Sequence, residues 1–250
     1  MKISVITTAL NSAGTLRKTL DSFYEQDWPN KEIIFVDGAS TDDTVAVAQS
    51  YPQAEMTLIS EPDSGMYDAL NKGLRMYSGD AFGVLNSDDR FHDKCSMRLI
   101  AESLARFDMV HGHVDYVRDH ETRDVLRAWR AQPRPKGGFK SGWMPCHTSF
   151  FVRRAVQEAV GTFNLAYRVS SDYDWMIRAI DLGGWTLDTR QEVLIDMMVG
   201  GMSTEGWRAY ADHNLQSLKI RQKLLGSGAI DFALLAKPLR KVGQFLGQRG

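Results

Sequence analysis

The chain has 250 residues, of which 43% are hydrophobic and 24% charged, and its formal net charge is -1. This length suits one sizeable α/β domain with a small appendage, and the near-zero charge gives no basis for nucleic-acid binding. No stretch approaches the ~20 apolar residues that span a bilayer, and no secretory signal opens the chain. Cys95 and Cys146 lack a CxxC spacing, so we expect free thiols and a cytoplasmic protein.

The first half alternates strand and helix patterns. Strands are predicted over 3–8, 32–36, 56–59 and 82–85, and helices over 12–23, 41–51 and 66–77. This alternation predicts parallel strands joined by right-handed crossovers, in an α/β fold with a mainly parallel central sheet flanked by helices. Ligands of such sheets bind beyond the carboxyl ends of the strands.

Polar residues lie at or after the carboxyl end of each of these predicted strands. They are Thr7, Asp37, Asp63 and the pair Asp88-Asp89. Because unpaired buried charge is costly, two acids directly after an apolar strand need water, a cation or hydrogen-bond donors. Two hard oxygen ligands suit a divalent metal that also holds a substrate's phosphates. The alternative interpretation is an exposed cap of the following helix.

The second half is less regular. A helix is predicted from Asp93 to Phe107, extended segments over 109–117, 123–129 and 150–152, and helices over 171–182 and 205–225, with a Pro/Gly-rich loop over 133–142. The segment 229–250 has a formal charge of +3 from Lys237, Arg240, Lys241, Arg249 and Asp231. It predicts either a basic amphipathic helix on an anionic membrane or a helix packed on the domain or a dimer partner.

Two common nucleotide-binding signatures are missing. After the first strand the chain reads Ala9-Leu10-Asn11-Ser12-Ala13-Gly14, which is not the GxGxxG of a Rossmann dinucleotide site. No GxxxxGK[ST] of a P-loop occurs either. Residues 61–73 form the longest specific run, in which Pro62 and Gly65 fix a turn before a helix whose N-terminus favours an anion.

Four stretches in combination carry a resemblance over most of residues 3–91. They are Val5-Ile6-Thr7, the run 36–42 (VDGASTD), 61–65 (EPDSG) with Asn71-Lys72-Gly73, and 85–89 (LNSDD). Weaker later landmarks are 147–151, 161–164, 171–175 and 200–203. On these residues the chain resembles inverting family 2 glycosyltransferases of the GT-A fold, near the members that assemble bacterial polysaccharides.

The resemblance implies a role for each matching residue. Thr7 and Asp37 contact the nucleotide base; Asp63, Gly65, Asn71 and Lys72 line the donor pocket; Asp88 binds ribose or donor sugar; Asp89 binds Mg²⁺ or Mn²⁺; and Asp172 is the general base. Asp174, two positions further along the helix, then faces elsewhere. His147 is either an acceptor or phosphate contact or a structural histidine, and Trp175 either stacks on a sugar or packs in the core.

The resemblance also implies a domain plan and a reaction. Residues 1–204 form the catalytic domain, with a nucleotide half (1–91) and an acceptor half (92–204), and 205–250 form a helical extension. The reaction moves one sugar from a nucleotide diphosphate sugar, expected to be UDP-linked, to a saccharide or lipid-linked acceptor, because the QxxRW motif of processive members is missing. The alternatives are a nucleotidyltransferase acting on sugar phosphates and a non-catalytic nucleotide-sugar-binding subunit. The glycosyltransferase is expected in the cytoplasm or at the inner face of the membrane, and the resemblance does not fix its oligomeric state.

Overall fold

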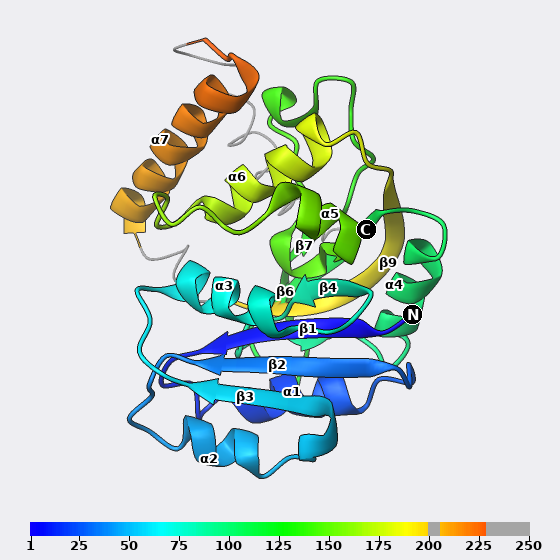
Figure 1. Cartoon of the computed structure of the whole chain (residues 1–250), viewed down its shortest axis with the longest axis vertical. Helices are drawn as coiled ribbons and strands as arrows, with labels where there is room; N and C mark the ends of the chain where they lie inside the picture. The colour runs from blue at the N-terminus through cyan, green and yellow to red at the C-terminus, as the bar shows by residue number, and fades with distance from the viewer. Residues whose placement is uncertain (200–205, 229–250) are drawn as a thin grey trace.

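The computed structural model describes residues 1–199 and 206–228 (Figure 1). Its strands are β1 (Ile3–Ala9), β2 (Lys31–Asp37), β3 (Met56–Ser60), β4 (Ala81–Val84), β5 (Arg90–Phe91), β6 (Met109–Val117), β7 (Val125–Trp129), β8 (Phe151–Arg153) and β9 (Leu187–Met198). Its α-helices are α1 (Leu16–Tyr24), α2 (Thr44–Gln49), α3 (Met66–Met76), α4 (Ser96–Leu104), α5 (Arg154–Val160), α6 (Ser171–Ile177) and α7 (Gly206–Leu225). Short 3₁₀ turns are η1 (Gln53–Glu55), η2 (Gly138–Ser141) and η3 (His147–Ser149), and a π-helical turn, η4 (Arg178–Leu182), follows α6.

One curled sheet runs through the molecule in the order β3-β2-β1-β4-β8-β6-β9-β5, with β7 paired to β6. The strands β3, β2, β1 and β4 are parallel, which confirms the α/β fold expected from the first half. The short strand β8 is antiparallel to both β4 and β6, and β9 runs parallel to β6. The carboxyl ends of β1, β2, β4, β6 and β9 therefore meet at one edge of the sheet.

The sheet is buried on both faces, as the unbroken apolar run in β2 predicts. Ile33 and Phe35 belong to the core that includes residues of α1, whereas Ile34 and Val36 belong to the core that includes residues of α3. Successive side chains of a strand point to opposite faces. This two-sided burial fixes the strand register and with it the residues that reach the carboxyl edge.

The longest strand, β9, has no counterpart among the predicted elements. Its first half carries polar and charged side chains that are half-buried or exposed, so the local pattern does not indicate a strand. Long-range pairing with β6 forms it instead. The predicted helix over 171–182 likewise divides into α6 and the π-helical turn η4.

The division into a nucleotide half and an acceptor half stays a prediction. A single sheet includes strands from both halves. The predicted boundary at 204/205, the landmark Gly200-Gly201-Met202-Ser203 and the segment 229–250 lie outside the described residues. Within the described part of the chain, none of the helices has the length and apolar character needed to cross a bilayer.

Candidate donor and catalytic site

Asp37 ends β2 at the carboxyl edge and is fully buried. Its carboxylate accepts hydrogen bonds from the backbone N–H of Ser40 at 2.9 Å, from the Ser40 hydroxyl and from the Ser60 hydroxyl at 2.6 Å. These donors compensate a charge that would otherwise be costly to bury. Thr7 is also fully buried, and its hydroxyl has no partner among the described residues. A direct contact of Thr7 with a nucleotide base stays a prediction.

The loop after β3 is held by residues of its own run. The Asp63 carboxylate accepts from the backbone N–H of Gly65 at 2.8 Å, and Gly65 precedes α3 with a φ of 125°, a region that L side chains rarely adopt. The Lys72 ammonium donates to the carbonyl of Pro62 at 2.7 Å and pairs with Glu61 at 2.9 Å. Lys72 therefore fixes the loop that carries Asp63.

Asn71 and Lys72 are buried side chains of α3 whose polar atoms contact protein rather than an open pocket. The Asn71 amide donates to the carbonyl of Phe163 at 3.0 Å and accepts from its backbone N–H at 2.8 Å. Both residues thus shape the site through backbone contacts. A direct contact of either residue with the donor stays a prediction.

Asp89 is 1% exposed and lies where β4 turns toward β5. Its two carboxylate oxygens accept from the side-chain amide of Asn86 at 2.8 Å and from the backbone N–H of Met198 at 3.1 Å. Burial, and next the neighbouring Asp88, raise the pKa of Asp89 well above its usual range, and burial also raises the pKa of Asp88. Burial makes the ionised form of both carboxyls less stable, so a bound cation would stabilise the two carboxylates. Oxygen ligands of this kind suit Mg²⁺ or Mn²⁺.

A second group of potential cation ligands comes from β6, from β9 and from the residue after β5. One ligand atom each from His92, Asp115 and Asp196 falls within 4.8 Å of the others. His92 Nδ1 is 2.6 Å from Asp196 Oδ1, whereas Arg123 Nε is 3.7 Å from Asp196 Oδ2 and Arg130 Nη1 is 2.5 Å from Asp115 Oδ1. Since arginines already pair with both carboxylates, a metal here would compete with them. Sequence reasoning missed this group because it assembles only when β6, β9 and the residue after β5 meet.

Asp172 lies in the first turn of α6 and is half-buried. Its Oδ1 accepts a hydrogen bond from the Tyr67 hydroxyl at 2.9 Å. The neighbouring Asp174 is buried and pairs with Arg178 at 2.9 Å, so it is a structural acid. Burial lowers the pKa of His147, which approaches Asp172, and this histidine is therefore neutral near pH 7.

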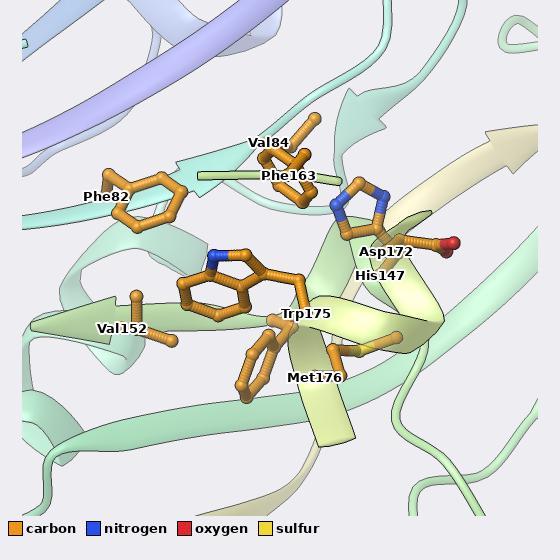
Figure 2. A pocket seen from close by; sticks show the side chains of 9 residues that line it. Phe82, Val84, His147, Val152, Phe163, Asp172, Trp175 and Met176 are labelled. Carbon is orange, nitrogen blue, oxygen red and sulfur yellow. The ribbon is translucent and has the colours of Figure 1, made fainter. Parts of the chain in front are cut away.

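Asp172 and His147 border a small cavity that is otherwise apolar (Figure 2). The cavity has a volume of about 10 Å³, far too small for a sugar ring. Trp175 is 2% exposed, donates from its indole to the carbonyl of Gly161 at 2.9 Å and packs edge-on against Phe82. The structure therefore gives Trp175 a packing role, and its buried ring has no free face for a sugar. An acceptor must reach Asp172 from outside this cavity.

Neither Tyr67 nor Asn86 is among the candidate site residues that the sequence predicts. Asn86 lies inside the run 85–89 that carried the resemblance, and Tyr67 lies between the stretches 61–65 and 71–73. Position in or next to these stretches was the available signal. The backbone N–H of Met198 has no sequence signal, because any non-proline residue offers one.

Comparisons with known proteins agree with this architecture. The model of the family "Glycosyl transferase family 2" matches residues 4–161. A PGL/p-HBAD biosynthesis glycosyltransferase of Mycobacterium bovis is 32% identical over 189 residues, which cover 70% of this chain and 68% of that protein. Glycosyltransferase AglE of Haloferax volcanii is 27% identical over 188 residues, covering 72% and 62% of the two chains.

Two solved structures show the same fold. S. aureus TarS aligns with a TM-score of 0.69 at 19% identity over 98% of this chain and 44% of its own. The mannosyltransferase PcManGT of Pyrobaculum calidifontis, in complex with GDP-Man and Mn²⁺, aligns with a TM-score of 0.66 at 22% identity over 99% of this chain and 70% of its own. The fold is thus that of GT-A-like glycosyltransferases, and the chain is a glycosyltransferase that belongs to family 2.

Proposed function

We propose that this glycosyltransferase moves a single sugar, with inversion and with Mg²⁺ or Mn²⁺ bound, from a nucleoside diphosphate sugar to a saccharide or lipid-linked acceptor in bacterial polysaccharide assembly. One spatial relationship carries the proposal. Asp172 and Val84 border the same cavity, and Val84 is the last residue of β4, four residues before the pair Asp88-Asp89. A candidate base and a candidate metal pair therefore lie at the same end of one strand.

The donor side consists of Asp37, the Asp63 loop and the acidic pair. Asp37 is the candidate hydrogen-bond partner of the nucleotide base, and Asp88 is the candidate contact for ribose or donor sugar. Asp89, with Asp88 beside it, would hold the divalent cation, which neutralises charge on the departing diphosphate. The side-chain amide of Asn86 and the backbone N–H of Met198 orient the Asp89 carboxylate, because each donates one hydrogen bond to it.

The acceptor side consists of Asp172 and the groups that hold it. An acceptor hydroxyl is a poor nucleophile until its proton is removed. Asp172 takes that proton while the acceptor oxygen bonds to the anomeric carbon and the bond from that carbon to the diphosphate breaks. The electron pair leaves with the nucleoside diphosphate. Attack opposite the leaving group inverts the anomeric carbon, and no covalent intermediate forms.

TarS has been solved with UDP-GlcNAc and PcManGT with GDP-Man and Mn²⁺. We propose a UDP-linked donor. A panel of UDP- and GDP-sugars, with Mg²⁺, Mn²⁺ or chelator and with or without membrane lipid extract, tests the donor, the metal and the acceptor class by measuring release of the nucleoside diphosphate.

Two variants sharpen this panel. Asp172→Asn should bind UDP normally but lose transfer, and Glu158→Gln, which changes an exposed acid on α5, should behave as the unmodified protein. Pyrophosphate release from nucleoside triphosphates would indicate a nucleotidyltransferase instead. Nucleotide-sugar binding without turnover of any donor would indicate a non-catalytic subunit.

A lipid-linked acceptor would bring the enzyme to a membrane surface, and the basic segment 229–250 is our candidate for that contact. The segment lies outside the described residues, so its sequence alone supports the idea. A chain that ends at residue 228 should lose co-sedimentation with anionic liposomes. Retained co-sedimentation would exclude this segment as the anchor.

A further inference from the structure

We propose that Tyr67 is a positioning residue that orients Asp172 and favours its ionised form for catalysis. The inference rests on the proposed function, in which Asp172 is the general base. Its foundation is the 2.9 Å hydrogen bond from the Tyr67 hydroxyl to Asp172 Oδ1, which joins residues 105 positions apart. Tyr67 lies only two residues after Gly65. One helix, α3, therefore begins at the donor loop and reaches the base.

The Tyr67 hydroxyl is held rigidly. Tyr67 is 6% exposed, and its ring lies 5.7 Å from the ring of Phe163. The backbone of Phe163 is in turn fixed by the paired hydrogen bonds of Asn71, one turn further along α3. A donor on a packed helix keeps its direction without losing further entropy when substrates bind. This geometry suits a group that sets the position of a reacting carboxylate.

The proton stays on Tyr67 throughout the working pH range. Burial, followed by the charge of Asp172, raises the pKa of Tyr67 well above its usual range. A hydroxyl that donates to a carboxylate stabilises the ionised carboxylate. Because Tyr67 engages only Oδ1, Oδ2 is the oxygen that would accept the proton of the acceptor hydroxyl.

Other charged or titratable groups around Asp172 have different partners. From η3, His147 approaches Asp172, but burial lowers its pKa and leaves it neutral. On α6 itself, Asp174 pairs with Arg178. From α7, Arg221 donates to the Tyr173 hydroxyl at 2.8 Å. Within residues 1–199 and 206–228, Tyr67 thus supplies the hydrogen bond recorded for the Asp172 carboxylate.

The test compares two tyrosines at opposite ends of the same helix. Tyr67→Phe removes the hydroxyl and keeps the ring. Tyr77→Phe is the matched control, because Tyr77 is 5% exposed and its hydroxyl donates to Gln157 Oε1 at 3.1 Å, away from Asp172. We expect kcat of Tyr67→Phe to fall roughly 10- to 100-fold, with donor KM and UDP affinity within about twofold. The control should keep normal kcat.

The pH profile separates positioning from a merely structural role. Without the donated hydrogen bond the ionised base is less favoured, so the acid limb of the kcat profile should move to higher pH in Tyr67→Phe only. An unchanged kcat, or a lower kcat with an unmoved acid limb, overturns the inference.

Asp172→Asn in the same assay separates this inference from the proposed function. If Asp172→Asn turns over normally, Asp172 is not the base and both ideas fail. If Asp172→Asn is inactive while Tyr67→Phe equals the control, only the role of Tyr67 fails. If both hold, the double variant should be no slower than Asp172→Asn alone, because Tyr67 acts through that carboxylate.

Discussion

The side-chain amide of Asn71 exchanges two hydrogen bonds, of 3.0 and 2.8 Å, with the backbone of Phe163 across 92 residues of sequence. The same helix, α3, ties down the donor loop through Lys72 and contacts the candidate base through Tyr67. Three polar side chains within six residues therefore connect the two sides of the site. A run that looks like a nucleotide-binding motif is, in the folded protein, also the element that sets donor and acceptor sides relative to each other.

Replacing Asn71 by Ala should destabilise the protein by about 2–4 kcal/mol, because it leaves the buried N–H and C=O of Phe163 without partners. Urea unfolding measures the change. Asn164→Ala is the control, since Asn164 accepts from the backbone of Ala166 in an exposed position, and we expect it to cost less than about 1 kcal/mol. Equal losses in both variants would contradict a special role for Asn71.

Replacing Gly38 by Ala should weaken donor binding without unfolding the protein. A Cβ at Gly38 would lie 2.7 Å from Asp63 Oδ2, so the carboxylate must move. We expect the Kd for UDP to rise on the order of 10-fold, as a loss of one charge-assisted contact would cause. Calorimetric titration measures it. Gly14→Ala is the control, because a Cβ there meets no atom within 4 Å. Normal UDP affinity in Gly38→Ala would show that Asp63 is not a donor contact.

Two variants should decide between the two candidate cation groups. Asp89→Ala should abolish metal-dependent transfer and the rise in Tm on adding Mn²⁺, because it removes the proposed ligand. His92→Ala should retain both, since the arginines already neutralise Asp115 and Asp196. The reverse result would place the catalytic metal at His92, and transfer by Asp89→Ala without added metal would remove the metal from the mechanism.

Glu32 should make stability depend on pH at the edge opposite the site. Burial alone would raise its pKa, but hydrogen bonds from Lys2, Ser4 and Ser78 outweigh burial and lower the pKa to about 2. A lowered pKa in the folded state stabilises the protein above the unfolded value near 4.5, and this contribution disappears as the pH falls toward 2. The shift corresponds to about 3 kcal/mol.

Urea unfolding of Glu32→Gln and of the unmodified protein checks this from pH 7 to pH 2. The difference in unfolding free energy should be largest at neutral pH and should shrink as the pH falls through the range 4.5 to 2. Glu158→Gln, an exposed control, should show no such trend. A difference for Glu32→Gln that stays constant with pH would contradict the assignment.

The sequence by itself determined the parallel half of the sheet and the polar residues at or after the carboxyl ends of its strands. The unbroken apolar run of β2 and the glycine before α3 are local signals. Strand and helix periodicities act over a few residues, so they can be read without a structure. The family resemblance came from the same runs, and the comparisons confirm it.

Only the tertiary structure decided which groups surround those residues. The polar half of β9 gives no local strand signal, yet its pairing with β6 brings the backbone of Met198 to Asp89. The contact of Tyr67 with Asp172 and the burial of Trp175 likewise depend on how α6 packs against α3 and β4. Such contacts join segments about 100 residues apart, and the free energy that selects them comes from packing of the whole core, which no local pattern contains.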